Sequence, residues 1–106
     1  MELRADVEVN FEFNHTRKTP MVNGFRPMHL ILENYLTSGT HFYYDKDCVL
    51  PGEKATGTIS FLTPEAYPQS CWIGKQIPIQ EGERVIGMAT VTRVLNPLLC
   101  GNKTTK

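Results

Sequence analysis

The feature that most constrains the fold is a series of short runs with strand character, each closed by a turn signal. Residues 7–13 (VEVNFEF) alternate apolar and polar side chains with a period of two, which buries one face and leaves the other in water. No segment combines an apolar helical stripe with capping residues. Further strands are predicted at residues 28–32, 40–44, 55–62, 71–79 and 85–95.

Local turn signals separate these runs. The Ser38-Gly39 step predicts a turn, and the Pro51-Gly52 pair predicts a type II turn, because Pro presets φ and Gly accepts a positive φ. Residues 80–84 (QEGER) predict a tight connection between two strands. Pro78 lacks an N–H for the strand ladder, so it must lie at an edge, a bulge or a strand end.

The segment RKTPMVNGFRP, residues 17–27, is a rigid approach to the second predicted strand. Pro20 and Pro27 lower the conformational entropy of the unfolded chain, and Gly24 permits a corner with a positive φ. Six strands with short turns in 106 residues predict one small antiparallel barrel or sandwich over residues 1–96. Residues 97–106 are predicted to be a tail.

Charge and cysteine content narrow the function classes. Eleven basic and eleven acidic residues cancel, which argues against a dedicated binder of nucleic acid or membrane surfaces and permits self-association. The three cysteines are widely spaced and lack a C-x-x-C pair, which favours reduced thiols over a disulfide. Neither a signal sequence nor an apolar run of about 20 residues is present, so a cytoplasmic location is expected.

The residues that could carry chemistry are few. One cluster of metal-binding side chains comprises His41, Asp45, Asp47 and Cys48. Its spacing fits no structural zinc site, and a solvated hairpin tip is the favoured interpretation. Three aromatic residues, Tyr43, Tyr44 and Trp72, would form a protein-binding patch if they were exposed together. No catalytic residue, cofactor or metal site is predicted, and the chain is expected not to be an enzyme.

Three segments together carry a family resemblance: RKTPMVNGFRP, VLPGEKATGTISFLTP and IPIQEGERVIGMATVTRVL. In this order and spacing they resemble the third, C-terminal β-barrel domain of elongation factor Tu. The resemblance spans residues 5–95 and is weakest over 37–48 and 65–76. It implies an all-β fold, a small closed six-stranded antiparallel Greek-key barrel.

The same resemblance bears on function. The phosphate loop G-x-x-x-x-G-K-[ST] is absent from the sequence, so GTP binding and hydrolysis are not expected. In the family, the third domain packs on the GTPase domain, contacts the exchange partner and holds the T-stem of aminoacyl-tRNA. The positions that the resemblance implies as tRNA or partner contacts are Arg17, Lys18, Thr37, Glu81, Gly82 and Arg84.

This implied surface is only partly kept. Met28 and Thr63 stand where the family has Gln and Lys, so two donors to RNA are lost. Glu83 replaces a Gly and adds a negative charge where phosphates would lie. We therefore predict a non-catalytic stand-alone barrel that acts as a protein-interaction adaptor or as a mimic of a translation component. The alternative is weak binding of the aminoacyl-tRNA T-stem.

Overall fold

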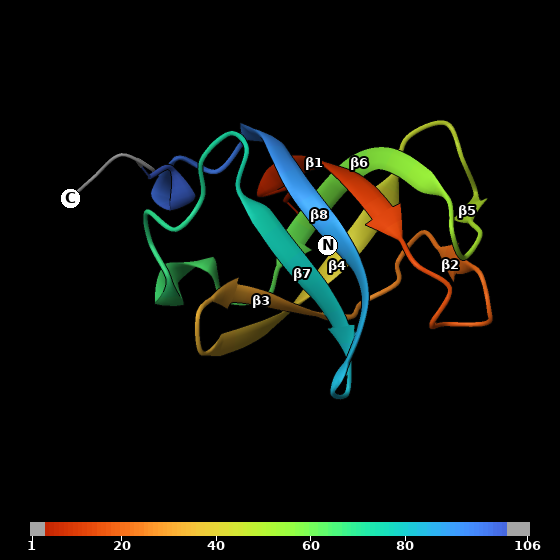
Figure 1. The fold of residues 1–106 in the computed structure, drawn as a ribbon. Helices are drawn as coiled ribbons and strands as arrows, with labels where there is room; N and C mark the ends of the chain where they lie inside the picture. Colours follow the sequence, from red (N-terminus) through yellow and green to blue (C-terminus); the bar gives the residue numbers. More distant parts are fainter. Residues whose placement is uncertain (1–3, 102–106) are drawn as a thin grey trace.

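Six antiparallel strands form a closed barrel in the computed structural model, which describes residues 4–101 (Figure 1). The predicted all-β class and the six-stranded barrel are therefore confirmed. Around the barrel the neighbouring strands are β1, β6, β4, β3, β7 and β8, and β8 pairs with β1 to close it. The barrel strands are β1 (Val7–Phe13), β3 (Met28–Leu32), β4 (Tyr35–Tyr43), β6 (Lys54–Phe61), β7 (Gln76–Glu81) and β8 (Arg84–Val94).

The alternation in the sequence becomes the two faces of the barrel wall. In β1, Val7, Val9, Phe11 and Phe13 point inward, and the residues between them are more exposed. The other strands add apolar side chains to the same core, so the barrel interior is filled rather than hollow. The inward apolar residues of the later barrel strands include Ile31, Ile59, Phe61, Ile77, Ile79, Ile86, Ala89 and Val91.

The rigid segment ahead of β3 crosses one end of the barrel. Within it, β2 (Met21–Val22) pairs with β5 (Cys48–Val49) outside the barrel, on the right in Figure 1. Gly24 has a φ of 93°, as the corner requires, and its N–H donates to the carbonyl of His41 at 2.9 Å. The N–H of His41 in turn donates to the carbonyl of Phe25 at 2.8 Å. The segment is thus bonded to β4 before the chain enters β3.

The predicted turn at Ser38-Gly39 is wrong, because β4 runs through both residues. The hairpin between β3 and β4 turns instead at Glu33-Asn34. A Cβ atom at Gly39 would lie 2.7 Å from Cγ2 of Ile59 and 3.0 Å from the imidazole of His29. Glycine is needed here for close packing inside a strand, not for a turn.

The strand predicted at 71–79 is shorter and shifted. β7 begins at Gln76, and Cys71 makes only an isolated parallel bridge with Cys100. Pro78 is paired with Met88 on β8, one residue before a register shift between Ile79 and Gln80. The pairing of β7 with β3 involves only Ile79 and Gln80, so Pro78 needs no N–H on that side. The type II turn at Pro51-Gly52 is also confirmed, since Gly52 has a φ of 87° and a hydrogen bond of 3.0 Å closes the turn.

The predicted tail is partly structured. A single 3₁₀ turn, η2 (Pro97–Leu99), follows β8, and Leu99 is completely buried. The N–H of Cys71 donates to the carbonyl of Leu99 at 2.8 Å, and the N–H of Gly101 donates to the carbonyl of Cys71 at 2.7 Å. The domain therefore extends to residue 101, and the rest of the predicted tail lies outside the described residues. A second 3₁₀ turn, η1 (Pro64–Ala66), packs near η2.

Candidate interaction surfaces

An ion pair joins the crossing segment to the β7–β8 hairpin. Arg17 Nη1 lies 3.0 Å from Glu81 Oε2, and Arg17 Nε donates to the hydroxyl of Thr19 at 3.0 Å. The guanidinium carbon also lies 4.4 Å from the centroid of the Phe25 ring, a cation–π contact. The side chains of Arg17 and Glu81 remain 23% and 36% exposed. Two N–H donors of Arg17 and one face of its guanidinium are therefore already engaged within the protein.

The other residues of the predicted contact surface divide between two places. Glu81 and Arg84 are paired at the end of the hairpin, and the exposed Gly82 forms its turn. Lys18 is exposed beside Arg17, with its ammonium 3.5 Å from the carbonyl of His15. Five of the six predicted residues thus belong to the crossing segment and the hairpin that it contacts. We call Arg17, Lys18, Glu81, Gly82 and Arg84 the hairpin surface.

Thr37 does not belong to the hairpin surface. It is 5% exposed on β4, and its hydroxyl lies 2.8 Å from the phenol oxygen of Tyr67. The condition for an aromatic protein-binding patch is not met, because Tyr43 is buried in the core. Tyr44 directly follows β4, and its hydroxyl donates to the carboxylate of Glu8 on β1 at 2.7 Å.

Two histidines form a polar centre inside the barrel, which the sequence analysis did not predict. His29 Nε2 lies 2.8 Å from His41 Nε2, and both side chains are essentially unexposed. His41 Nδ1 lies 2.9 Å from the hydroxyl of Tyr43, and His29 Nδ1 lies 3.3 Å from the carbonyl oxygen of Thr37. We call His29, His41 and Tyr43 the histidine centre.

The bonds of the histidine centre are all satisfied when both imidazoles are neutral. The carbonyl of Thr37 can only accept, so His29 carries its proton on Nδ1 and accepts at Nε2. His41 then donates from Nε2 and accepts the hydroxyl proton of Tyr43 at Nδ1. Burial lowers the pKa of His29 to about 4 and lowers the pKa of His41 well below its usual value. A charge on either ring would have no counter-ion inside this aromatic enclosure.

Aromatic rings enclose the two histidines. The rings of Phe11, Phe13 and Phe25 pack around His41, and the ring of Phe61 packs against His29. Such a site is enclosed and fully hydrogen-bonded, which fits a structural role in specifying the core.

The suggested metal cluster is not brought together. His41 faces the core, whereas Asp45 and Asp47 are exposed beyond the end of β4. Among residues 4–101, the structure contains no group of three or more His, Cys, Asp or Glu side chains that could hold a metal ion. Residues 45–47 are exposed, whereas Cys48 lies on β5 and is only partly exposed. Within the same range, no helix is long and apolar enough to span a membrane.

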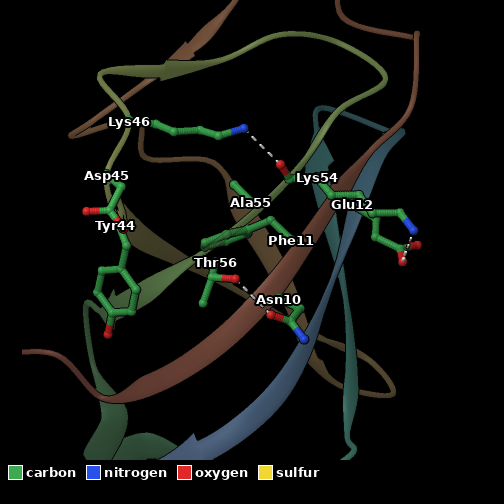
Figure 2. A pocket seen from close by; sticks show the side chains of 9 residues that line it. All are labelled: Asn10, Phe11, Glu12, Tyr44, Asp45, Lys46, Lys54, Ala55 and Thr56. Atoms are coloured by element: carbon green, nitrogen blue, oxygen red, sulfur yellow. Dashed lines mark hydrogen bonds and ion pairs between the residues drawn. The ribbon is translucent and has the colours of Figure 1, made fainter.

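An open groove of about 600 Å³ lies between β1, β6 and the end of β4 (Figure 2). Lys46 reaches across it and donates to the carbonyl of Lys54 at 3.1 Å. On the other rim, Lys54 lies 3.7 Å from the carboxylate of Glu12. The hydroxyl of Thr56 donates to Asn10 at 3.1 Å. These polar groups are bonded to each other, so they do not converge on a ligand position.

The outer side of the β3–β4 hairpin carries an apolar surface. Leu30 and Leu36 are paired on adjacent strands and therefore lie side by side on the outer face. Leu30 and Leu32 also line a shallow cavity of about 340 Å³ against the loop before β7, together with Glu33 and Lys75. We call this the β3 patch: Leu30, Leu32, Leu36, Trp72 and Pro78.

No protein-family model matches the chain. The resemblance to the C-terminal domain of elongation factor Tu therefore stays a prediction, and the barrel by itself does not identify a family.

Proposed function

We propose that the chain is a non-catalytic module that binds a protein partner through the β3 patch. The observation that carries the proposal is the cluster of apolar side chains on the outside of the barrel. Leu32 and Leu36 are each 42% exposed, and Ile73, next to Trp72, is 72% exposed. Glu33 and Lys75 line the same cavity as the apolar residues. An apolar centre with a polar rim is the usual anatomy of a protein-binding surface.

The side chains of the β3 patch are held in fixed positions, as expected for a binding surface. The side chains lie on paired strands and a bonded loop: Lys75 donates to the carbonyl of Ile31 at 2.6 Å and lies 4.8 Å from the centroid of the Trp72 ring. A patch held in place loses little conformational entropy when a partner covers it. The resemblance to elongation factor Tu suggests a component of the translation apparatus as the partner.

Weak binding of tRNA is the second candidate, and it rests on the exposed cations Lys18 and Arg84 beside the hairpin turn. Three observations favour the protein partner. Arg17 is already paired with Glu81, Glu83 adds a negative charge at the turn, and the chain has no net charge. Affinity for RNA depends strongly on the number of phosphates that free cations neutralise.

A capture experiment with matched variants tests the proposal. The full chain is immobilised as wild type, as Leu36→Glu in the β3 patch, and as Val22→Glu at the β2–β5 end of the molecule. Both changed residues are exposed, so each variant adds the same charge at a comparable cost to folding. Each is incubated with a lysate before and after nuclease treatment, and retained proteins are identified by mass spectrometry.

We expect a protein that wild type and Val22→Glu retain and that Leu36→Glu loses by at least about tenfold, because a charge in an apolar interface is left unpaired. Equal retention by all three variants would place the interface elsewhere. Retention that disappears in all three after nuclease treatment would favour the RNA candidate instead.

A further inference from the structure

We propose that Cys71 and Cys100 are an oxidation site, where a peroxide converts two thiols into one intramolecular disulfide. The link would fasten the segment 97–101 to the loop that leads into β7. This inference is independent of the partner-binding proposal, since it uses neither the β3 patch leucines nor the hairpin surface.

The backbone brings the two cysteines together from positions 71 and 100 of the chain. They are direct partners in a parallel bridge, flanked by hydrogen bonds of 2.8 Å to Leu99 and 2.7 Å from Gly101. Adjacent strands lie about 4.8 Å apart, which is inside the range of about 4.4–6.8 Å between Cα atoms that a disulfide spans. The backbone spacing therefore permits the link.

The two thiols differ in access, and this difference sets the order of the steps. Cys100 is exposed and Cys71 is completely buried, and both are free thiols. The Cys100 thiol loses its proton, and the thiolate attacks a peroxide oxygen. The O–O bond breaks, a sulfenic acid forms, and the departing hydroxide takes up a proton and leaves as water. The sulfur of Cys71 then attacks that sulfur, its proton leaves, and a second water departs as the S–S bond forms. The peroxide is reduced, and the two thiols are oxidised by two electrons.

The surroundings of Cys71 affect the second step. Burial raises the pKa of the Cys71 thiol, although the Ser70 hydroxyl, 3.8 Å away, and the Lys75 charge act in the opposite direction. Lys75 itself is anchored close by, donating to the carbonyls of Ile31 and Ser70. Closure of the link is therefore expected to be faster at pH 8.5 than at pH 7.

The third cysteine is an internal control. Cys48 lies on β5, pairs with Val22 and is at the opposite end of the fold from the 71–100 bridge (Figure 1). Lys and Arg positions also place each cysteine in its own tryptic peptide, which makes the linkage readable. The peptides span residues 47–54, 55–75 and 94–103.

The experiment treats the full, purified chain with a modest excess of hydrogen peroxide and compares intact mass and non-reduced tryptic peptides. We expect a loss of about 2 Da and a linked species that joins 55–75 to 94–103. Cys48→Ser should give the same link. The exposed Cys100→Ser, which leaves the core unchanged, should abolish it, and the oxidised wild type should unfold about 5 °C or more above the reduced protein.

Other products overturn the proposal. These are a link that involves Cys48, dimers joined between chains, or oxidation of Cys100 to acids without any link to Cys71. A link in the unfolded but not in the native protein would also overturn it, so the reaction is repeated in denaturant. In that sample, scrambled pairings including Cys48 are the expected result.

Discussion

Two parts of the molecule use groups that can carry charge to hold the chain together, and they do so in opposite environments. The histidine centre lies inside the barrel, with both rings neutral and shielded from water. The Arg17–Glu81 pair lies at the surface, with both groups partly exposed. The contacts are equally short, 2.8 and 3.0 Å. Distance therefore says little about energy here, because the cost of losing a partner depends on whether water can replace it.

The largest effect is expected from His41→Ala, which removes the middle member of the histidine centre. The change leaves Nε2 of His29 and the hydroxyl of Tyr43 buried without their partner, and it opens a cavity among the phenylalanines. Unmet polar groups and a cavity together should lower the free energy of unfolding by about 3–5 kcal/mol. Urea unfolding measures the loss.

A matched control is His15→Ala, because His15 is exposed and lies outside the barrel wall. Its effect should stay within about 0.5 kcal/mol. If His41→Ala cost no more than His15→Ala, the histidine centre would have no special role in stability.

Acidification should act on the same centre. An unfolded histidine titrates near pH 6.5, whereas folded His29 titrates near 4, so the unfolded state binds more protons between these values. The free energy of unfolding should therefore fall as the pH drops from about 6.5 to about 4, by about 3 kcal/mol for His29 alone. Urea unfolding at several pH values gives the slope directly.

Asp6 is expected to oppose this trend. It is buried, and burial raises the pKa of its carboxyl despite bonds from Asn96 and from the backbone of Phe61. The folded state then binds this proton more readily than the unfolded state, which adds stability as the pH falls. Asp6→Asn should therefore steepen the acid loss. If Asp6→Asn showed no fall in the free energy of unfolding between about pH 6.5 and pH 4, that result would contradict the neutral histidine centre.

The comparison also explains which features could be predicted from the sequence. The alternation of residues 7–13 predicted the barrel wall, since burial of one face is a local pattern that repeats in every strand. The histidine centre depends on His29 and His41 from two strands, and no local pattern pairs them. One signal was available: His41 and Tyr43 lie two residues apart, as do His29 and Ile31, which gives each pair one facing direction.

Gly39 and Thr37 were misread for the same physical reason. A Ser-Gly step favours a turn locally, but Ile59 and His29 from neighbouring strands require glycine inside β4. Thr37 resembled a surface contact by its position in a motif, whereas Tyr67 from a distant loop covers it. Local propensity does not contain the demands of tertiary neighbours.

A medium effect is expected at the crossing segment, from Gly24→Val. Gly24 has a φ of 93°, which a β-branched residue adopts only under strain, although no atom lies within 4 Å of the added Cβ. We expect a loss of about 1–2 kcal/mol in the free energy of unfolding, arising from backbone strain alone. Gly24→Asn is the matched control, because Asn tolerates a positive φ and should lose clearly less. Equal losses for Val and Asn would show that the position is limited by something other than φ.

The smallest effect is expected at the surface pair. Arg17→Ala should lower the free energy of unfolding by no more than about 1 kcal/mol, because water replaces much of the lost contact with Glu81. In a double-mutant cycle with Glu81→Ala, the coupling should fall from about 0.5 kcal/mol toward zero in high salt.

The Arg17→Ala variant also tests RNA binding. A cation that already has a carboxylate partner releases few counterions, so Arg17→Ala should leave the salt dependence of any tRNA binding unchanged, whereas a free phosphate contact would reduce the slope by about one. Titration of labelled tRNA at several salt concentrations separates these outcomes, and a reduced slope would show that Arg17 leaves Glu81 to bind RNA.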